Sequence, residues 1–526
     1  MEKPSYPSLS LTTTLPCQPV LIVSPIRPFN NPTYAQVHDL PTELLCRIFE
    51  FCACPEPNVI ATPHTFQPQY SPRWTQIMHV CRLWREVALS LTRLWTIVDF
   101  VCPQWTSTFL KHAKGLPITV VVDYSKLDMC ARQHSLRQLF EHVDKIHTLS
   151  VDLHEPWDLQ VDAELSEKMN NPAPNLQSLT LMAGRLSPLP GVELPFGLFS
   201  GLLPNLRRLH LKGSAFVRIL LNSTYLPNLC ALEIDDGRLS LPELKAILDR
   251  FPELQRLSLR STIAFVEGYT DFTTLSPMPG LVHFEVTKVD PFVWDHCIKP
   301  ALPPTIPSLK VHCQFTKRHG MDGALELITS AAAHAAFPPY PAGSAPALPL
   351  MVSIDERCSR ISDARTIGVV CILGPVLQPA RVFDLEIAGP LREPQANDLL
   401  LALCRALPHA LAHAALLRVA SVVHLSNFDW RAILELMPRL KEVAIVSPSP
   451  HYFIHAIGGE DGTTAQLERA SLVKTTVGAH TVRDVEECVA ARKRSGACAI
   501  KWRVQECIVT EALKARINRM TDGRVV

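Results

Sequence analysis

Six polar side chains alternate with leucine or isoleucine at positions where they could form one binding face. They are Arg208, His210, Lys212, Glu233, Arg256 and Arg260. Alternate residues of a β-strand point to opposite faces, so these side chains would project from one side of a sheet. Guanidinium and ammonium groups pair with carboxylates or phosphorylated segments, which favours an acidic target. The alternative is a solvated face of mixed charge, because Glu233 would partly neutralise the strands that carry arginine.

The sequence has no local catalytic motif. Glycine-rich phosphate loops, a G-x-S-x-G turn and an H-E-x-x-H zinc motif are all absent. Its sixteen cysteines form no C-x-x-C pair, so we expect no metal site. We interpret Asp235 and Asp236 as a solvated strand end, and His210 and His283 as exposed side chains. No catalysis and no cofactor are therefore expected; the alternative is an active site assembled from residues far apart in the sequence.

A repeated unit would position the polar side chains. The pattern Pro-x-Leu-x-x-Leu-x-Leu, with apolar substitutions, occurs five times. Its units begin at Pro174, Pro204, Pro227, Pro252 and Pro279. They are 30, 23, 25 and 27 residues apart, close to the spacing of about 20–29 residues in leucine-rich repeats.

Further, less regular units are expected on either side of these five. We place them at Ile146, Leu149 and Val151, at Val382, Leu385 and Ile387, and at Leu440, Val443 and Ile445. A weaker unit would begin at Pro307, with His312 at a leucine position.

Helices should return the chain between the strands. Ser240 and Glu243 form a Ser-x-x-Glu capping box, and Ser426 with Asp429 predicts a second helix start. Alternating strands and helices predict an α/β fold, a short helical module followed by an irregular leucine-rich-repeat solenoid with a curved parallel sheet. The alternative is a generic α/β domain whose strands are rich in leucine.

The segment from Val37 to Val98 predicts two short amphipathic helices. Pro41 followed by Glu43 is typical of a helix start. Apolar residues then recur at helical spacing over residues 44–49 and again over residues 77–88. Two helices of this length cannot bury both apolar stripes alone, which makes the segment a candidate docking module. The alternative is a helical hairpin packed into its own domain.

The segment resembles the F-box-like domain of large fungal protein families. The resemblance rests on Leu-Pro-x-Glu-Leu-Leu-x-x-Ile-Phe at residues 40–49, Val-Cys-Arg-x-Trp-Arg at 80–85 and Leu-Trp at 94–95. The connection between the helices is longer than is usual in that family, and its prolines predict a looped-out insertion. The order of a helical module before leucine-rich repeats also resembles F-box proteins.

The resemblance implies a non-catalytic receptor. Its helices would bind the Skp-type adaptor of a cullin-RING ubiquitin ligase, and its repeat face would bind an unknown protein target. The residues implied in adaptor binding or in packing of the module are Leu40, Pro41, Leu44, Ile48, Phe49, Val80, Cys81 and Trp84. The alternative is a leucine-rich-repeat interaction scaffold without ligase association.

Composition limits the other classes of partner. The chain has 526 residues, of which 51 are basic and 50 are acidic. This balance does not favour nucleic-acid or membrane-surface binding driven by bulk charge. The longest apolar stretch, Asp398 to Val419, is interrupted by charged residues, so no membrane span is expected. Scattered cysteines are typical of a reducing compartment, which indicates the cytoplasm or the nucleus.

These patterns divide the chain into five segments. We expect a disordered tail at 1–36, the F-box-like module at 37–98 and a first repeat block at 99–330. An Ala/Pro-rich loop at 331–349 would separate this block from a second repeat block and C-terminal cap at 350–526.

Overall fold

Not every residue of the chain is described by the structure, a computed structural model. The described residues are 40–53, 73–98, 103–123, 129–153, 167–168, 170–183, 199, 203–213, 226–263, 274–303, 306–314, 320–333, 350–358, 365–373, 381–389, 393–421, 425–446, 450–458, 464 and 466–520. The predicted tail and most of the proline-rich insertion lie outside these residues, as do residues 334–349 of the predicted Ala/Pro-rich loop. The described residues group into two compact units that divide the chain after Leu89.

The first unit is helical, as predicted. It contains α1 (Thr42–Ala53), the 3-10 helix η4 (Arg73–His79) and α2 (Arg82–Ser90). The carbonyl of Pro41 accepts the first N–H bonds of α1, so the chain enters the helix at the predicted proline. Phe49 of α1 is fully buried, and its ring meets that of Trp84 edge to face, with centroids 5.2 Å apart.

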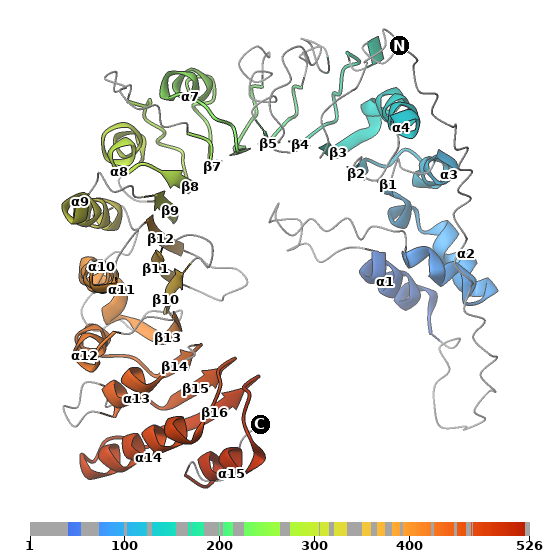
Figure 1. Ribbon diagram of the computed structural model, residues 1–526. Coiled ribbons are helices and arrows are strands. Elements are labelled where there is room, and N and C mark those ends of the chain that lie inside the picture. The colour runs from blue at the N-terminus through green and yellow to red at the C-terminus, as the bar shows by residue number, and fades with distance from the viewer. Residues whose placement is uncertain are drawn as a thin grey trace, which may run out of the picture. The chain divides into compact units, whose positions relative to one another are not determined.

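Among the described residues, the second unit contains one sheet of sixteen strands (Figure 1). The strands are β1 (Ile97–Val98), β2 (Ile118–Asp123), β3 (Ile146–Leu153), β4 (Ser178–Ala183), β5 (Arg208–Lys212), β6 (Ala231–Asp235), β7 (Arg256–Arg260), β8 (His283–Val289), β9 (Ser308–Gln314), β10 (Leu350–Cys358), β11 (Arg365–Leu373), β12 (Arg381–Gly389), β13 (Ala414–Ser421), β14 (Glu442–Ile445), β15 (Arg469–Val473) and β16 (Lys501–Gln505). Their order in the sheet is β1 to β9, then β12, β11 and β10, then β13 to β16.

The described helices of this unit lie before, between and after the strands. They are η5 (Thr92–Trp95), α3 (Pro103–Ala113), α4 (Met129–Glu141), η7 (Val143–Lys145), α7 (Leu241–Leu248), α8 (Pro291–Val293), η9 (Trp294–Ile298), η10 (Lys299–Ala301), α9 (Gly320–Ala333), α10 (Glu393–Ala406), α11 (Pro408–Ala412), α12 (Asn427–Glu435), α13 (His451–Ile457), α14 (Ala479–Arg494) and α15 (Glu511–Met520). Figure 1 shows α7, α9, α10, α12, α13 and α14 on one face of the sheet. Within the described part of the chain, none of the helices combines the length and the apolar character needed to span a membrane.

The leucine register of the repeats is confirmed. Leu179, Leu209, Leu232 and Leu257 are direct partners across β4, β5, β6 and β7. All four are buried, because this row faces the layer of helices. The row two residues later, which includes Leu211 and Leu259, is buried in the same way. The spacing of leucines therefore predicted both the strands and their inward face.

A second regular feature explains the asparagine in three of the units. The side-chain amide of Asn205 donates to the carbonyl of Pro174 at 2.7 Å, and Asn228 donates to the carbonyl of Pro204 at 2.7 Å. Asn175 makes a similar bond, of 2.6 Å, to a backbone carbonyl near the preceding strand. Each asparagine thus satisfies a carbonyl of the turn before it and stacks one unit on the next.

The sheet is mostly parallel, as predicted, and the exception is β11, which is antiparallel to both β10 and β12. Only residues 359–364 and 374–380 connect these strands, whereas a parallel crossover needs about a dozen residues or more. The spatial order of these three strands is therefore the reverse of their order in the sequence. β12 pairs with β9, and β13 pairs with β10.

The predicted repeats on β9 and β12 were out of register. Leu309, which the weaker unit placed before the strand, is the direct partner of Phe284 within it. His312 consequently lies in a polar row and not at an inward leucine position. On β12, Phe383 pairs with Leu309. The first inward residue of this strand is therefore Phe383, two residues before the predicted Leu385. Irregular spacing had hidden both offsets.

Removal of a helix cap should have a small, local effect. The backbone N–H of Ser240 donates to the carboxylate of Glu243 at 2.8 Å, and the Ser240 hydroxyl accepts the N–H of Glu243 at 3.4 Å. We expect Ser240→Ala to destabilise α7 by about 1 kcal/mol. Hydrogen exchange of the amides of α7 should detect it. Ser426→Ala, which removes the equivalent box of α12, is the matched control, and the effect of each variant should stay in its own helix.

Candidate functional site

The structure separates the eight predicted adaptor residues by exposure. Pro41, Leu44, Ile48 and Val80 are exposed, while Leu40, Cys81 and Trp84 are half-buried and Phe49 is buried. The latter group includes the Phe49–Trp84 contact that joins the helices of the first unit. The Leu-Trp pair of the resemblance lies in the second unit, where Trp95 is buried against Phe109.

Helix α1 has two apolar stripes. Leu45 and Phe49 form the buried stripe, each with 0% of its surface exposed. Leu44, Ile48 and Phe51 form the other, which is exposed by 50%, 43% and 78% respectively. The spacing of the exposed residues, four and then three, places them on one helical face. We call these three residues the α1 stripe.

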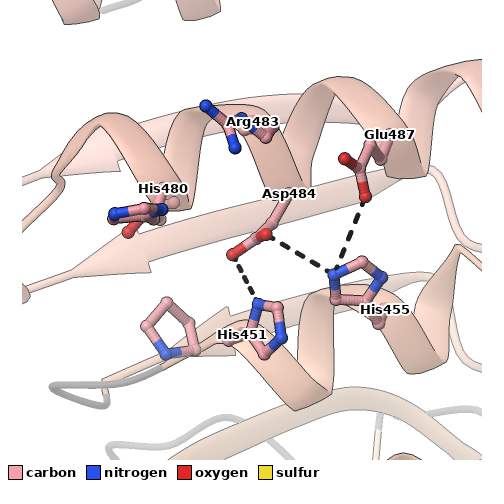
Figure 2. A pocket seen from close by; sticks show the side chains of 8 residues that line it. His451, His455, His480, Arg483, Asp484 and Glu487 are labelled. Carbon is pink, nitrogen blue, oxygen red and sulfur yellow. Dashed lines mark ion pairs between the residues drawn. The ribbon is translucent and has the colours of Figure 1, made fainter.

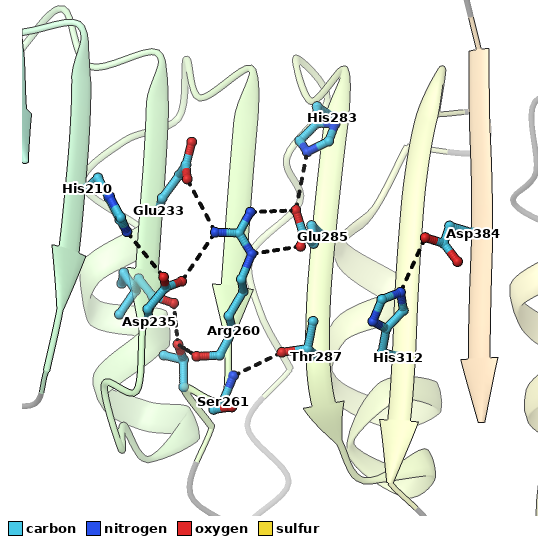
Figure 3. A network of polar contacts seen from close by, with 12 residues as sticks. His210, Glu233, Asp235, Arg260, Ser261, His283, Glu285, Thr287, His312 and Asp384 are labelled. Atoms are coloured by element: carbon cyan, nitrogen blue, oxygen red, sulfur yellow. Dashed lines mark hydrogen bonds and ion pairs between the residues drawn. The ribbon is translucent and has the colours of Figure 1, made fainter. Parts of the chain in front are cut away.

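The second surface is the polar face of the sheet, which carries the predicted target-binding residues. Its rows alternate with the leucine rows, and Figure 3 shows the central part over β5 to β9 and β12. Of the predicted residues, Arg208 and Arg256 are exposed, Lys212, Glu233 and Arg260 are half-buried, and His210 is buried.

Arg260 is the centre of this face. Its guanidinium donates two hydrogen bonds to the carboxylate of Glu285, at 2.7 Å and 2.9 Å. The third nitrogen lies 3.4 Å from Oδ1 of Asp235 and 3.5 Å from Oε2 of Glu233. One cation thus holds three carboxylates from the two strands on either side (Figure 3).

Two histidines extend the cluster. Nε2 of His210 lies 3.2 Å from Oδ2 of Asp235, and Nε2 of His283 lies 3.9 Å from Oε2 of Glu285. The sequence-based expectations that His210 is exposed and that Asp235 is a solvated strand end were therefore wrong. Only 7% of His210 and 4% of Asp235 is exposed. Each side chain makes a polar contact with the other across the strands in place of hydrogen bonds to water.

The ion pairs shift the proton affinities of the central groups. Burial would raise the pKa of Glu285, but hydrogen bonds from His283 and Arg260 and the positive charges of Arg260 and Lys310 hold it well below its usual range. Burial likewise opposes ionisation of Arg260, yet the bonds to Glu285 and the nearby carboxylates raise the pKa of the guanidinium. Both groups are therefore firmly charged at neutral pH.

A third histidine continues the polar face towards β12. His312 lies 3.0 Å from Oε2 of Glu386 and 3.4 Å from Oδ2 of Asp384. Burial would lower the pKa of His312, but the contact of its ring N–H with the carboxylate of Asp384 and the charges of the neighbouring carboxylates raise it. Protonated His312 would bridge these two acidic side chains.

The arginines predicted to bind an acidic target do not form a continuous basic surface. Arg208 and Arg256 share a row, but Ala231 lies between them and Arg260 is occupied by carboxylates. Over β6 to β9 and β12, the polar rows contain five carboxylates and three cations: Glu233, Asp235, Glu285, Asp384 and Glu386 against Arg256, Arg260 and Lys310. The centre of this region is therefore acidic, and the exposed arginines Arg208 and Arg256 lie in its outer row.

Sequence reasoning missed a third group of polar residues. His451 and His455 of α13 converge with Asp484 of α14. The signal was present as a pair of histidines four residues apart, but the second helix lies too far along the sequence to link to it by motif. No family model matches the chain, and no curated protein matches it. The function is therefore inferred from the residues and their geometry.

Proposed function

We propose that the chain is a non-catalytic substrate receptor of a cullin-RING ubiquitin ligase. The first unit would dock a Skp-type adaptor, and the polar face of the sheet would bind a target protein. The observation that carries this proposal is the α1 stripe, because it leaves large apolar side chains in water beside a fully buried stripe of the same helix. The chain would supply proximity and specificity, while the ligase supplies the chemistry.

The exposure of the α1 stripe favours a partner over a merely structural hairpin. An ordinary surface helix turns its polar face to water and has one apolar stripe. Contiguous exposed apolar side chains typically mark an interaction site. Val80 and Leu83, exposed by 57% and 38%, add further apolar surface to the same unit. Both stretches belong to the segment that resembles the F-box-like domain.

For the sheet, we infer an irregular leucine-rich-repeat solenoid. Support comes from the in-register leucine rows, the stacked asparagines and the placement of helices on one face. Such folds bind partners on the strand face. Because the centre of this face is acidic, we infer a target with basic side chains, in place of the acidic target that the sequence favoured.

Adaptor binding should depend on the α1 stripe. The test is co-purification and calorimetric titration of the full chain with a Skp-type adaptor. We expect wild-type protein to bind at micromolar concentration or below, and Leu44→Ala with Ile48→Ala to weaken binding at least roughly thirtyfold. Buried contacts at such interfaces are each worth about 2 kcal/mol, or a factor of thirty.

Phe51→Ala and Phe428→Ala form a matched pair for the same test. Their phenylalanines are exposed by 78% and 80%, on α1 and α12 respectively. We expect only Phe51→Ala to weaken adaptor binding, while circular dichroism shows both variants folded. If wild-type protein does not bind the adaptor at micromolar concentration, the ligase function fails and the interaction scaffold without ligase association takes its place.

A further inference from the structure

Two neighbouring helices of the second unit present ligand-type side chains to each other. His451 and His455 are four residues apart on α13, so they share one face of that helix. Asp484 and Glu487 are three residues apart on α14 and face them across the interface (Figure 2). These side chains line an open cavity of about 460 Å³.

The distances within the group suit one small cation. Nδ1 of His451 lies 2.9 Å from one oxygen of Asp484, and Nε2 of His455 lies 3.4 Å from the other. All three ligand atoms lie within 4.8 Å of one another. Around a tetrahedral zinc ion with bonds of about 2.0–2.1 Å, neighbouring ligand atoms are roughly 3.3–3.4 Å apart. For an ion to enter, the 2.9 Å contact must widen slightly, and any separation near the 4.8 Å limit must shorten.

The carboxylate at the centre is the least accessible member. Asp484 is 7% exposed, whereas His451 is exposed and His455 is half-buried. Without a metal, the ring nitrogens that face Asp484 can donate N–H bonds to it. On metal binding each neutral imidazole would move that proton to its other nitrogen and offer a lone pair.

The packing of the helices holds this geometry in place. Gly458 ends α13 against α14, where an added Cβ would lie 2.9 Å from Cα of Cys488. About one turn beyond Cys488 on α14, buried Arg492 donates to the carbonyl of Ile457 and to the hydroxyl of Thr464. The close contact at Gly458 and the buried hydrogen bonds of Arg492 therefore hold α13 and α14 in a fixed relative position. This reduces the conformational entropy that the ligand side chains would lose when an ion binds.

The charges around the group also favour a divalent cation. Asp484 and Glu487 supply two carboxylates, and Oε2 of Glu487 lies 4.0 Å from Nε2 of His455. Arg483 and His480 line the same cavity, and neither is joined to the group by an ion pair in Figure 2. Imidazole and carboxylate together are ligands for zinc and related transition metals.

We propose that His451, His455 and Asp484 form a site for a divalent transition metal, with zinc as the ion of best fit. Glu487 or water completes the coordination. The ion links α13 to α14 near the C-terminal end of the sheet. This site departs from the sequence-based expectation that the chain has no metal ligands, and it does not depend on the proposed adaptor function.

The test is zinc titration of the full chain after treatment with a chelator. We expect one tight site per chain in calorimetry, with at least about tenfold weaker binding in His455→Gln and in Asp484→Asn. His480→Gln is the matched control, since this histidine lines the same cavity outside the ligand group, and its affinity should equal that of wild-type protein. Circular dichroism shows whether each variant is folded.

Hydrogen exchange gives a second measurement that separates this site from other zinc-binding side chains. Zinc should slow exchange in α13 and the first half of α14 of wild-type protein, but not of Asp484→Asn. The proposal is overturned if wild-type protein does not take up zinc, or if His455→Gln and Asp484→Asn bind it as tightly as His480→Gln. Uptake without protection of these helices also overturns it.

Discussion

Replacing Arg492 with methionine should destabilise the C-terminal part of the sheet unit by about 3 kcal/mol or more. The side chain is 2% exposed, and its guanidinium donates to the carbonyls of Cys498, Ile457, Thr464 and Leu467 and to the hydroxyl of Thr464. Methionine would fill similar space but leave these acceptors buried without donors, and each such loss costs about 1–3 kcal/mol. Burial lowers the pKa of Arg492, but arginine remains charged.

The neighbouring Lys493→Met is the matched control, because Lys493 is exposed on the same helix. Hydrogen exchange is the suitable measurement, since a long sheet built from stacked units can open locally. We expect Arg492→Met to speed exchange in α13, α14 and β15, and Lys493→Met to leave it unchanged. Equal exchange in the two variants would show that the buried bonds add no net stability.

The fold was predictable where the information is local. Ser240 and Glu243 are three residues apart, and the capping box they form needs no partner elsewhere. The leucines of each strand are two residues apart, and their repetition at intervals of 23 to 30 residues places equivalent leucines on adjacent strands. In these cases the spacing of residues in the sequence matches the geometric repeat of the helix or strand, so the sequence pattern predicts the structure correctly.

The remaining features depend on contacts between residues that lie far apart in the sequence, which no local pattern links. The hairpins β10–β11–β12 follow from short connections in a region where leucine spacing is irregular. Arg260 was predicted as a target-binding residue, and the ion pair with Glu285 was missed because that partner lies 25 residues away on the adjacent strand. His451 and Asp484 meet only after two helices pack side by side. Side-chain pairing across elements, not secondary structure, limited the prediction of the site.

Replacing Arg260 with methionine should destabilise β6, β7 and β8 by about 3 kcal/mol at neutral pH. The substitution would leave Glu233, Asp235 and Glu285 close together without their shared cation. Removing one partner of a buried ion pair typically costs about 3–5 kcal/mol. We expect the lower end here, because 17% of the Arg260 side chain is exposed. Faster hydrogen exchange in these three strands is the measurement, and Arg256→Met, an exposed arginine of the same strand, is the matched control.

The pH dependence gives this prediction its sharpest form. In wild-type protein the pKa of Glu285 is lowered by folding, so its ion pair contributes stability above the unfolded pKa of about 4.3 and loses it as the pH falls further. In Arg260→Met the carboxylates are buried without a cation, so taking up protons relieves their repulsion. The difference between the variant and wild-type protein should therefore be large at pH 7 and shrink towards pH 4. Arg256→Met should show no such convergence, and a difference for Arg260→Met that is constant over this range would show that lost packing, not charge, is the cause.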